Sequence, residues 1–505
     1  MVQSPAPLTK TTLAETSKHF TDMSKLKIAI LVSVFGEYSV QFIGFATIMI
    51  LARMLTPEEI GVYAVAGSAA MLATELRSLG VVGYLIREKE LDELKTRAAL
   101  GVNIIVSWGL GVVMIAAAPF IAIAYEEPAL QNILWILSIT FFLGPFTSVS
   151  NALWRRNLEL HHVIQQKLLG TICQSVTTIL FVWWGFSYYA LAIGAAIELA
   201  VEFLYAITLP PKGTYWVPRF VWMKDLVRFG IYTSSSNLFI RFSEGVPDLV
   251  IGKFRTMGDV GLFSRGLGAI LFLNKIITAA VIPVVMPHLS EVQRTGKSVA
   301  GAYLRAVNLQ CSLSWPVFAV VSVAAYPMIR GLFGDQWDLA VPIASILAFW
   351  AILISVHCFA ASALMVTGHE HLLFWAGLVV FGFRLVAVVA AAPYGLETIA
   401  WSIVASGLFE LLINTWAIRR ATGLTVMRMV KAFVPNFIIA LGCWITTKLL
   451  DLAMPFEEGD PWISIMTIAA CLPIVWLLLL RLTGHEAWEI VQGMFNKAIR
   501  RQASG

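Results

Sequence analysis

The chain repeats one stretch of its sequence after 200 positions: R-M-L-T-P-E-E-I-G-V-Y, from Arg53 to Tyr63, and K-F-R-T-M-G-D-V-G-L-F, from Lys253 to Phe263. At this constant offset a cation, a threonine, an acidic residue, a glycine and an aromatic residue recur. The clearest pairs are Thr56 with Thr256, Glu59 with Asp259, and Gly61 with Gly261. A long internal repeat predicts a structure built from two related halves.

The composition places this repeat in a membrane. The 505 residues are 58% hydrophobic and 13% charged, whereas soluble domains average about 25% charged residues. The mean hydropathy is +0.78. These values indicate a polytopic membrane protein, and duplication in such a protein is typical of a transporter with its substrate path between the halves.

The apolar runs predict an all-α fold. Because roughly 20 apolar residues cross a bilayer as a helix, we expect about fourteen transmembrane helices, over 28–52, 60–86, 98–124, 130–153, 168–186, 188–209, 226–251, 259–286, 303–329, 338–366, 372–392, 396–418, 431–453 and 462–482. They form two parallel-repeat six-helix bundles and two additional C-terminal helices.

The predicted boundaries follow from these runs and from a Pro-Pro-Lys-Gly linker start. They are a cytoplasmic N-terminal tail 1–27, a first bundle 28–209, a cytoplasmic linker 210–225, a second bundle 226–418, two additional helices 419–482 and a cytoplasmic tail 483–505. The N-terminal residues are polar and lack the apolar core of a signal peptide.

The distribution of positive charge predicts the orientation. Of the 36 Lys and Arg residues, 26 fall in alternate loops and tails that include both termini, and five lie at the opposite edges. Cytoplasmic loops retain positive charge, so we expect both termini in the cytoplasm and a location in the bacterial inner membrane. The net charge of +5 then requires no nucleic-acid partner.

The sequence predicts no cofactor, no metal site and no catalytic residues. The five cysteines are scattered and the histidines lack metal-ligand spacing. There is no phosphate-binding Gly-rich loop and no nucleophile elbow. Any uphill transport is therefore expected to use an ion gradient or the gradient of the substrate.

The repeated motif has the chemistry of a helix start. Thr56 can cap a helix N-terminus, Pro57 suits the first turn, and Glu58 and Glu59 favour the positive end of the helix dipole. The second copy keeps the threonine and one acidic residue but lacks the proline. Both copies are expected at the outside ends of the helices.

Charged side chains inside the predicted spans are the candidate functional residues, since a charge at mid-membrane costs roughly 2.5–3.5 kcal/mol even on a lenient scale. The offset of 200 pairs Glu37 with Asn237 and Glu75 with Lys275. Arg265 and Arg384 are two further cations. On the seventh span a polar stripe recurs at helical spacing, formed by Asn237, Arg241, Glu244 and Asp248.

One interpretation is a hydrated cavity lined by the first, second, seventh and eighth spans, where cations bind a phosphate-bearing substrate. The candidate substrate-binding residues are Arg241, Lys275, Arg265, Arg384 and Asn237. The candidates for a coupling ion or an internal ion pair are Glu37, Glu75, Glu244 and Asp248. The alternative is that the charges only lock helices together, Arg241 with Glu37 or Glu244, and Glu75 with Lys275.

The chain resembles bacterial polysaccharide transporters, the Wzx-type oligosaccharide-lipid flippases of the multidrug/oligosaccharidyl-lipid/polysaccharide exporter superfamily. The resemblance lies in I-L-A-R-M-L-T-P-E-E-I-G-V-Y from Ile50 to Tyr63, in Leu79-Gly80, and in the charged turn from Arg87 to Glu90. Ile60 departs from the aromatic residue usually found before that glycine. The number of spans and the two-bundle layout extend the resemblance over nearly the whole chain.

This resemblance implies a flippase rather than an enzyme. Its substrate would be an undecaprenyl-diphosphate-linked oligosaccharide, moved from the cytoplasmic to the periplasmic leaflet by alternating access. The pathway would be exopolysaccharide, capsule or O-antigen (lipopolysaccharide) biosynthesis. The implied partners are this lipid-linked oligosaccharide, membrane lipids, and the polysaccharide polymerase and export machinery.

Three other functions fit parts of the sequence. A lipid II-type flippase shares the span count and the cationic interior. A multidrug/cation antiporter of the same superfamily shares the repeat but typically lacks the last two spans. A membrane polysaccharide polymerase or ligase usually carries a large outside loop, and the outside connections here are short.

Overall fold

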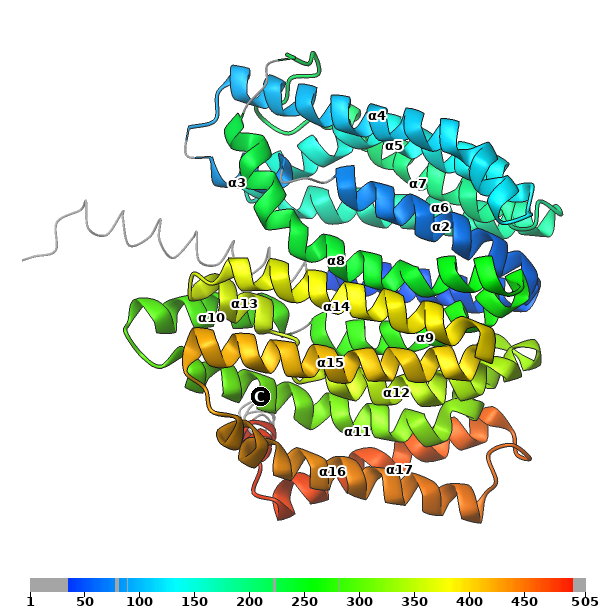
Figure 1. Cartoon of the computed structure of the whole chain (residues 1–505), viewed down its shortest axis with the longest axis vertical. Helices are drawn as coiled ribbons and strands as arrows, with labels where there is room; N and C mark the ends of the chain where they lie inside the picture. The colour runs from blue at the N-terminus through cyan, green and yellow to red at the C-terminus, as the bar shows by residue number, and fades with distance from the viewer. Residues whose placement is uncertain (1–34, 78–80, 89, 221–223, 280, 494–505) are drawn as a thin grey trace, which may run out of the picture.

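The computed structural model describes residues 35–77, 81–88, 90–220, 224–279 and 281–493. For residues 224–237, 279 and 282–284 only the backbone is described. The predicted tail 1–27 lies outside these ranges. The described residues form helices joined by short connections, as the sequence predicts (Figure 1).

For description, the first half means residues 35–208 and the second half residues 224–422. The first half begins with the helix Phe35–Met54. It continues with α2 (Pro57–Arg77), α3 (Val81–Arg87), α4 (Glu93–Ala124), α5 (Ala129–Arg156), α6 (Leu160–Trp183) and α7 (Tyr189–Thr208).

The second half contains α8 (Lys224–Phe254), α9 (Met257–Ala279), α10 (Ile282–Arg294), α11 (Val299–Phe333), η1 (Asp335–Ala340), α12 (Val341–Ser355), α13 (Ala360–Val366), α14 (Glu370–Ala391), η2 (Ala392–Tyr394) and α15 (Leu396–Thr422). The helices α16 (Val426–Ala453) and α17 (Pro461–Leu482) follow. Figure 1 shows the two halves one above the other, with α16 and α17 beyond α11.

Twelve helices among the described residues are long and apolar enough to cross a membrane. The predicted spans 168–186 and 226–251 correspond to α6 and α8, which are 24 and 31 residues long but are not among these twelve. The all-α, multi-pass membrane fold is therefore confirmed. The count of fourteen spans stays a prediction.

The two ends of the bundles differ in how the core is built. We call the end where Met54 is followed by α2, and Phe254 by α9, the motif end, and the opposite end the linker end. The largest buried cluster combines both halves near the motif end, with Leu55, Val65, Ile133, Val260, Ile270 and Ile343. Near the linker end, one cluster belongs to the second half and α16, and another to the first half. Among the side chains that the structure describes, the buried cluster shared by the two halves is thus the one at the motif end.

The predicted span 338–366 is interrupted, which the sequence analysis does not anticipate. Helix α12 ends at Ser355 and α13 begins at Ala360. His357 lies in this break and forms two hydrogen bonds. Its Nδ1 bonds with the Tyr303 hydroxyl (2.8 Å), and its Nε2 bonds with Thr415 Oγ1 (2.8 Å). Polar side chains of neighbouring helices therefore stabilise a break at membrane depth, as such breaks require.

Candidate functional site

Both copies of the repeated motif start a helix, as predicted. The Glu59 backbone N–H donates to Thr56 Oγ1 (3.3 Å), and the Thr56 N–H donates to Glu59 Oε2 (2.8 Å), which makes a reciprocal capping box. In the second copy the Asp259 N–H donates to Thr256 Oγ1 (3.1 Å). These caps fix the positions where α2 and α9 begin, at the motif end.

Arg241 is the centre of a charged group that joins the halves. Its Nη1 lies 2.8 Å from Glu244 Oε2 on the same helix, and its Nε lies 3.4 Å from Glu75 Oε1 on α2. The Arg241 side chain is nevertheless 49% exposed. The expected pairing with Glu244 is present, whereas Glu75 pairs with Arg241 instead of the expected Lys275, because α2 packs against α8 as well as α9.

Glu37 has a partner that the sequence analysis missed. Lys167 Nζ lies 3.3 Å from Glu37 Oε1, and the two side chains are 44% and 42% exposed. The predicted span begins at 168, so Lys167 falls in the preceding predicted loop. In the structure α6 begins at Leu160, so Lys167 stands two turns inside a helix. A polar stripe at helical spacing, Lys167 with Thr171 and Gln174, is the signal that could have identified it.

Lys275 lies near this second pair. It is an exposed residue of α9 and interacts electrostatically with Lys167, Glu37 and Arg241. At 1.5 Å per residue, Glu75 and Lys275 lie about 27 Å along their helices from the motif end. The accessible charges of both halves therefore gather beyond the shared core, toward the linker end.

Arg384 belongs to a different group, within the second half. The side chain is 5% exposed, donates from Nε to Ser406 Oγ (2.9 Å) and from Nη2 to Glu410 Oε2 (3.1 Å), and covers the ring of Trp350. This is the arrangement of an internal ion pair, because both charges are satisfied by neighbouring helices.

Arg265 also lies apart from Arg241 and Lys275. It is on α9 near the motif end, and its guanidinium carbon lies 5.4 Å from the ring centre of Phe333 and 4.9 Å from that of Trp337. Cation–π contacts of this kind stabilise a cation away from water. The structure thus separates Arg265 from the group around Arg241.

Asp248 is buried between the halves. It is 9% exposed, and its Oδ2 accepts a hydrogen bond from Ser68 Oγ of α2 (2.8 Å), while Oδ1 has no hydrogen-bond partner among the described atoms. Asn237, the remaining candidate, lies on α8 at a position whose side chain is outside the described residues.

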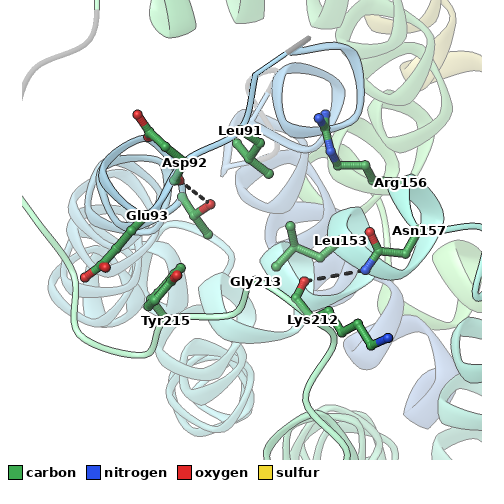
Figure 2. A pocket seen from close by; sticks show the side chains of 10 residues that line it. Leu91, Asp92, Glu93, Leu153, Arg156, Asn157, Lys212, Gly213 and Tyr215 are labelled. Atoms are coloured by element: carbon green, nitrogen blue, oxygen red, sulfur yellow. Dashed lines mark hydrogen bonds between the residues drawn. The ribbon is translucent and has the colours of Figure 1, made fainter.

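A separate cavity of about 290 Å³ lies at the linker end of the first half. Figure 2 shows side chains of three segments around it: the start of α4, the end of α5, and the linker. Asn157 Nδ2 donates to the Lys212 carbonyl (3.5 Å), and a Cβ atom built on Gly101 of α4 would stand 2.4 Å from the carbonyl oxygen of Arg219. The linker is therefore packed onto the first half.

The chemistry available in these groups is ionic and hydrogen-bonding. Among the residues that the structure describes, no cluster of three or more His, Cys, Asp or Glu side chains could hold a metal ion. The exposed group contains three cations, Lys167, Arg241 and Lys275, and carboxylates from both halves. Guanidinium and ammonium groups are the usual protein ligands of phosphate oxygens.

The fold is that of a multi-pass helical membrane protein, and known structures share it. The protein is similar to the structure titled lipid II flippase MurJ, inward closed conformation, with a TM-score of 0.74 and 14% identity over 90% of this chain and 99% of that one. It is also similar to an inward-facing multidrug resistance transporter of the MATE family, with a TM-score of 0.53 and 17% identity over 80% and 95%. At these identities the likeness concerns the fold.

The chain belongs to the polysaccharide biosynthesis protein family, whose model matches residues 50–342. It is 22% identical to the teichuronic acid biosynthesis protein TuaB of Bacillus subtilis, over 87% of this chain and 91% of that protein. It is 23% identical to the succinoglycan biosynthesis transport protein ExoT of Rhizobium meliloti, over 75% and 76%. The predicted family and the prediction of a transporter rather than an enzyme are confirmed.

Proposed function

We propose that this protein is a flippase that moves lipid-linked oligosaccharides across the membrane during polysaccharide biosynthesis. The observation that carries the proposal is membership of the polysaccharide biosynthesis family by a chain with a transporter fold. The relatives named for teichuronic acid and succinoglycan biosynthesis support a glycan as cargo.

The substrate we propose is an oligosaccharide on undecaprenyl diphosphate, in the bacterial inner membrane, with both protein termini in the cytoplasm. The positive charge at the linker end supports this orientation. The cargo would enter from the linker end, because the halves share their core at the motif end. Polysaccharide polymerase and export machinery would then use the flipped repeat units.

The diphosphate would bind Arg241, Lys275 and Lys167. These side chains are accessible although they stand inside long helices, which supports a hydrated space between the halves. In the structure Glu37 pairs with Lys167, and both Glu75 and Glu244 pair with Arg241. Phosphate oxygens would replace these carboxylates, and a released carboxylate is a candidate site for a coupling ion. Arg384 and Arg265 would serve packing instead.

A lipid II-type flippase is the second candidate, favoured by the fold likeness to MurJ. Both cargoes carry a diphosphate on a polyprenyl lipid, so the cations do not separate them. The family match favours a polysaccharide repeat unit. The cargo that accumulates when the protein is lost would distinguish the two functions.

The test is deletion of the gene, followed by analysis of lipid-linked sugars on each leaflet. We expect repeat units of a surface polysaccharide to accumulate on the inner leaflet, and wild-type protein to restore export. Arg241→Gln and Lys275→Gln should each lower export at least about tenfold, since one lost charged hydrogen bond to phosphate is worth about 1.5–3 kcal/mol. Lys297→Gln, at an exposed turn, is the matched control.

Normal surface polysaccharide in the deletion strain, with no second flippase present, would contradict the proposal. Accumulation of lipid II with arrested cell-wall growth would instead support the second candidate. Full export by Arg241→Gln and Lys275→Gln at normal protein levels would overturn the role of these cations and leave the flippase assignment in place.

A further inference from the structure

The two glycines of the repeated motif lie at the closest approach of the halves. A Cβ atom built on Gly61 would stand 1.7 Å from the carbonyl oxygen of Met257, and one built on Gly261 would stand 1.9 Å from the carbonyl oxygen of Pro57. These are backbone atoms of the facing helix and cannot rotate away. Only glycine therefore permits α2 and α9 to meet in this way.

The cations of the motif cross to the other half. Arg53 Nη2 donates to the Gly331 carbonyl in the last turn of α11 (2.7 Å), and Lys253 Nζ donates to the carbonyl of Ala124, the last residue of α4 (2.5 Å). The last carbonyls of a helix lack intrahelical partners and attract cations. Each half thus holds one helix end of the other.

Two aromatic side chains beyond those helix ends complete the reciprocal contact. The hydroxyl of Tyr125, which follows α4, donates to the Leu249 carbonyl of α8 (3.0 Å). The indole of Trp337, which follows α11, donates to the Ala52 carbonyl of the first helix (2.7 Å). Both bonds join the first half to the second at the motif end.

We propose that the repeated motif is the gate that closes the transport path at the motif end, and that the glycine pair and the crossed cations hold it shut. The inference rests on the proposed function, because a flippase must open this end to release its cargo. The bonds suit a reversible closure, because they run from side chains to backbone carbonyls. When the halves part, water can replace each side-chain donor. Thr56 and Thr256 set the helix starts, so the motif also fixes where the glycines meet.

The gate is tested by enlarging the glycines and measuring access to a buried residue. Val65 is fully buried, and its Cγ2 lies 2.7 Å from a Cβ built on Gly252 of the other half. In a chain whose native cysteines are replaced by alanine, Val65→Cys is labelled with a membrane-impermeant maleimide. We expect Gly61→Ala and Gly261→Ala to raise the labelling rate about tenfold by shifting the population toward the open state.

Matched controls exist on the same two helices. A Cβ on Gly268 of α9 would meet no atom within 4 Å, and one on Gly67 of α2 would meet only Tyr63, at 3.7 Å. Gly268→Ala and Gly67→Ala should therefore leave labelling unchanged. Equal labelling of the gate variants and these controls would overturn the inference.

A cysteine pair keeps the test decisive if the alanine variants fail to fold. Glu58 Cγ lies 3.5 Å from a Cβ built on Gly258, which places positions 58 and 258 within reach of a disulfide. Oxidation of the Glu58→Cys, Gly258→Cys protein should stop flipping, and a reductant should restore it. Undiminished flipping by the fully cross-linked protein would contradict the gate.

These outcomes are separate from those that test the proposed function. Labelling of Val65→Cys reports the gate without any cargo. If labelling responds as expected and no lipid-linked oligosaccharide is flipped, the gate stands and the cargo is wrong. Comparison of right-side-out with inverted vesicles tests whether the motif end faces outside.

Discussion

Exposure distinguishes Arg241 and Lys167 from the other intramembrane cations at the residue scale. Arg384 is enclosed by Ser406, Glu410 and Trp350, whereas Arg241 and Lys167 are almost half exposed while paired. The sequence could identify Arg241 and Arg384 as charges inside apolar runs. It could not distinguish their environments, because a charged residue inside a transmembrane span is equally unusual at both positions.

Exchange of the charges of Lys167 and Glu37 tests whether this pair only holds helices together. In the Lys167→Glu, Glu37→Lys protein an ion pair can form again at the same place. If Lys167 contacts the diphosphate, we expect normal protein levels but flipping reduced about tenfold, as one charged hydrogen bond is lost. Export of surface polysaccharide is the measurement, with Lys167→Arg as the conservative control. Full recovery by the exchanged protein would indicate a structural pair.

Arg384 and Glu410 should behave as a packed pair. Loss of Glu410 leaves the buried charge of Arg384 unpaired, which costs about 3–5 kcal/mol, and loss of Arg384 leaves the partly buried Glu410 carboxylate without this partner. Replacement of both residues by apolar ones is often neutral. We therefore expect Arg384→Met and Glu410→Met to lower thermal stability more than the double variant does. Unfolding of the purified protein in detergent measures this. A double variant less stable than either single variant would show that the pair contributes more than mutual neutralisation.

At the scale of elements, the helix starts could be predicted and one helix break could not. Thr56 and Glu59 carry the capping pattern in the sequence itself, so the start of α2 follows from local chemistry. The break at 356–359 lies in a continuously apolar stretch, and its partners Tyr303 and Thr415 come from distant parts of the chain. A single histidine inside an apolar run is the only local signal of it.

His357→Ala should destabilise the second half at this break. The substitution leaves the buried Tyr303 hydroxyl and Thr415 without their shared partner, at a cost of about 1–3 kcal/mol. We expect a lower Tm in detergent, while His288→Ala, at an exposed position of α10, should leave the Tm unchanged. Equal Tm values for the two variants would mean that water replaces the imidazole in the break.

The whole molecule shows which long-range features a repeat can and cannot predict. The duplication and the apolar runs are enough to predict an all-α membrane protein with two related halves. They do not predict that the halves share a core at the motif end, because that depends on the backbone approach at Gly61 and Gly261. The first turns of α6 are polar, so the predicted span began only after Lys167. The pair of Lys167 with Glu37 was therefore not predicted.

The reciprocal glycine contact has a consequence for the ancestry of the chain. Gly61 meets Met257 and Gly261 meets Pro57, so each half offers the surface that it receives, as identical subunits do about a two-fold axis. A six-helix ancestor with this surface would pair with its own copy, and fusion of two genes would preserve that pairing. Glu75 in one half and Lys275 in the other could arise only after the gene had been duplicated, because a dimer of identical chains carries the same residue at both positions.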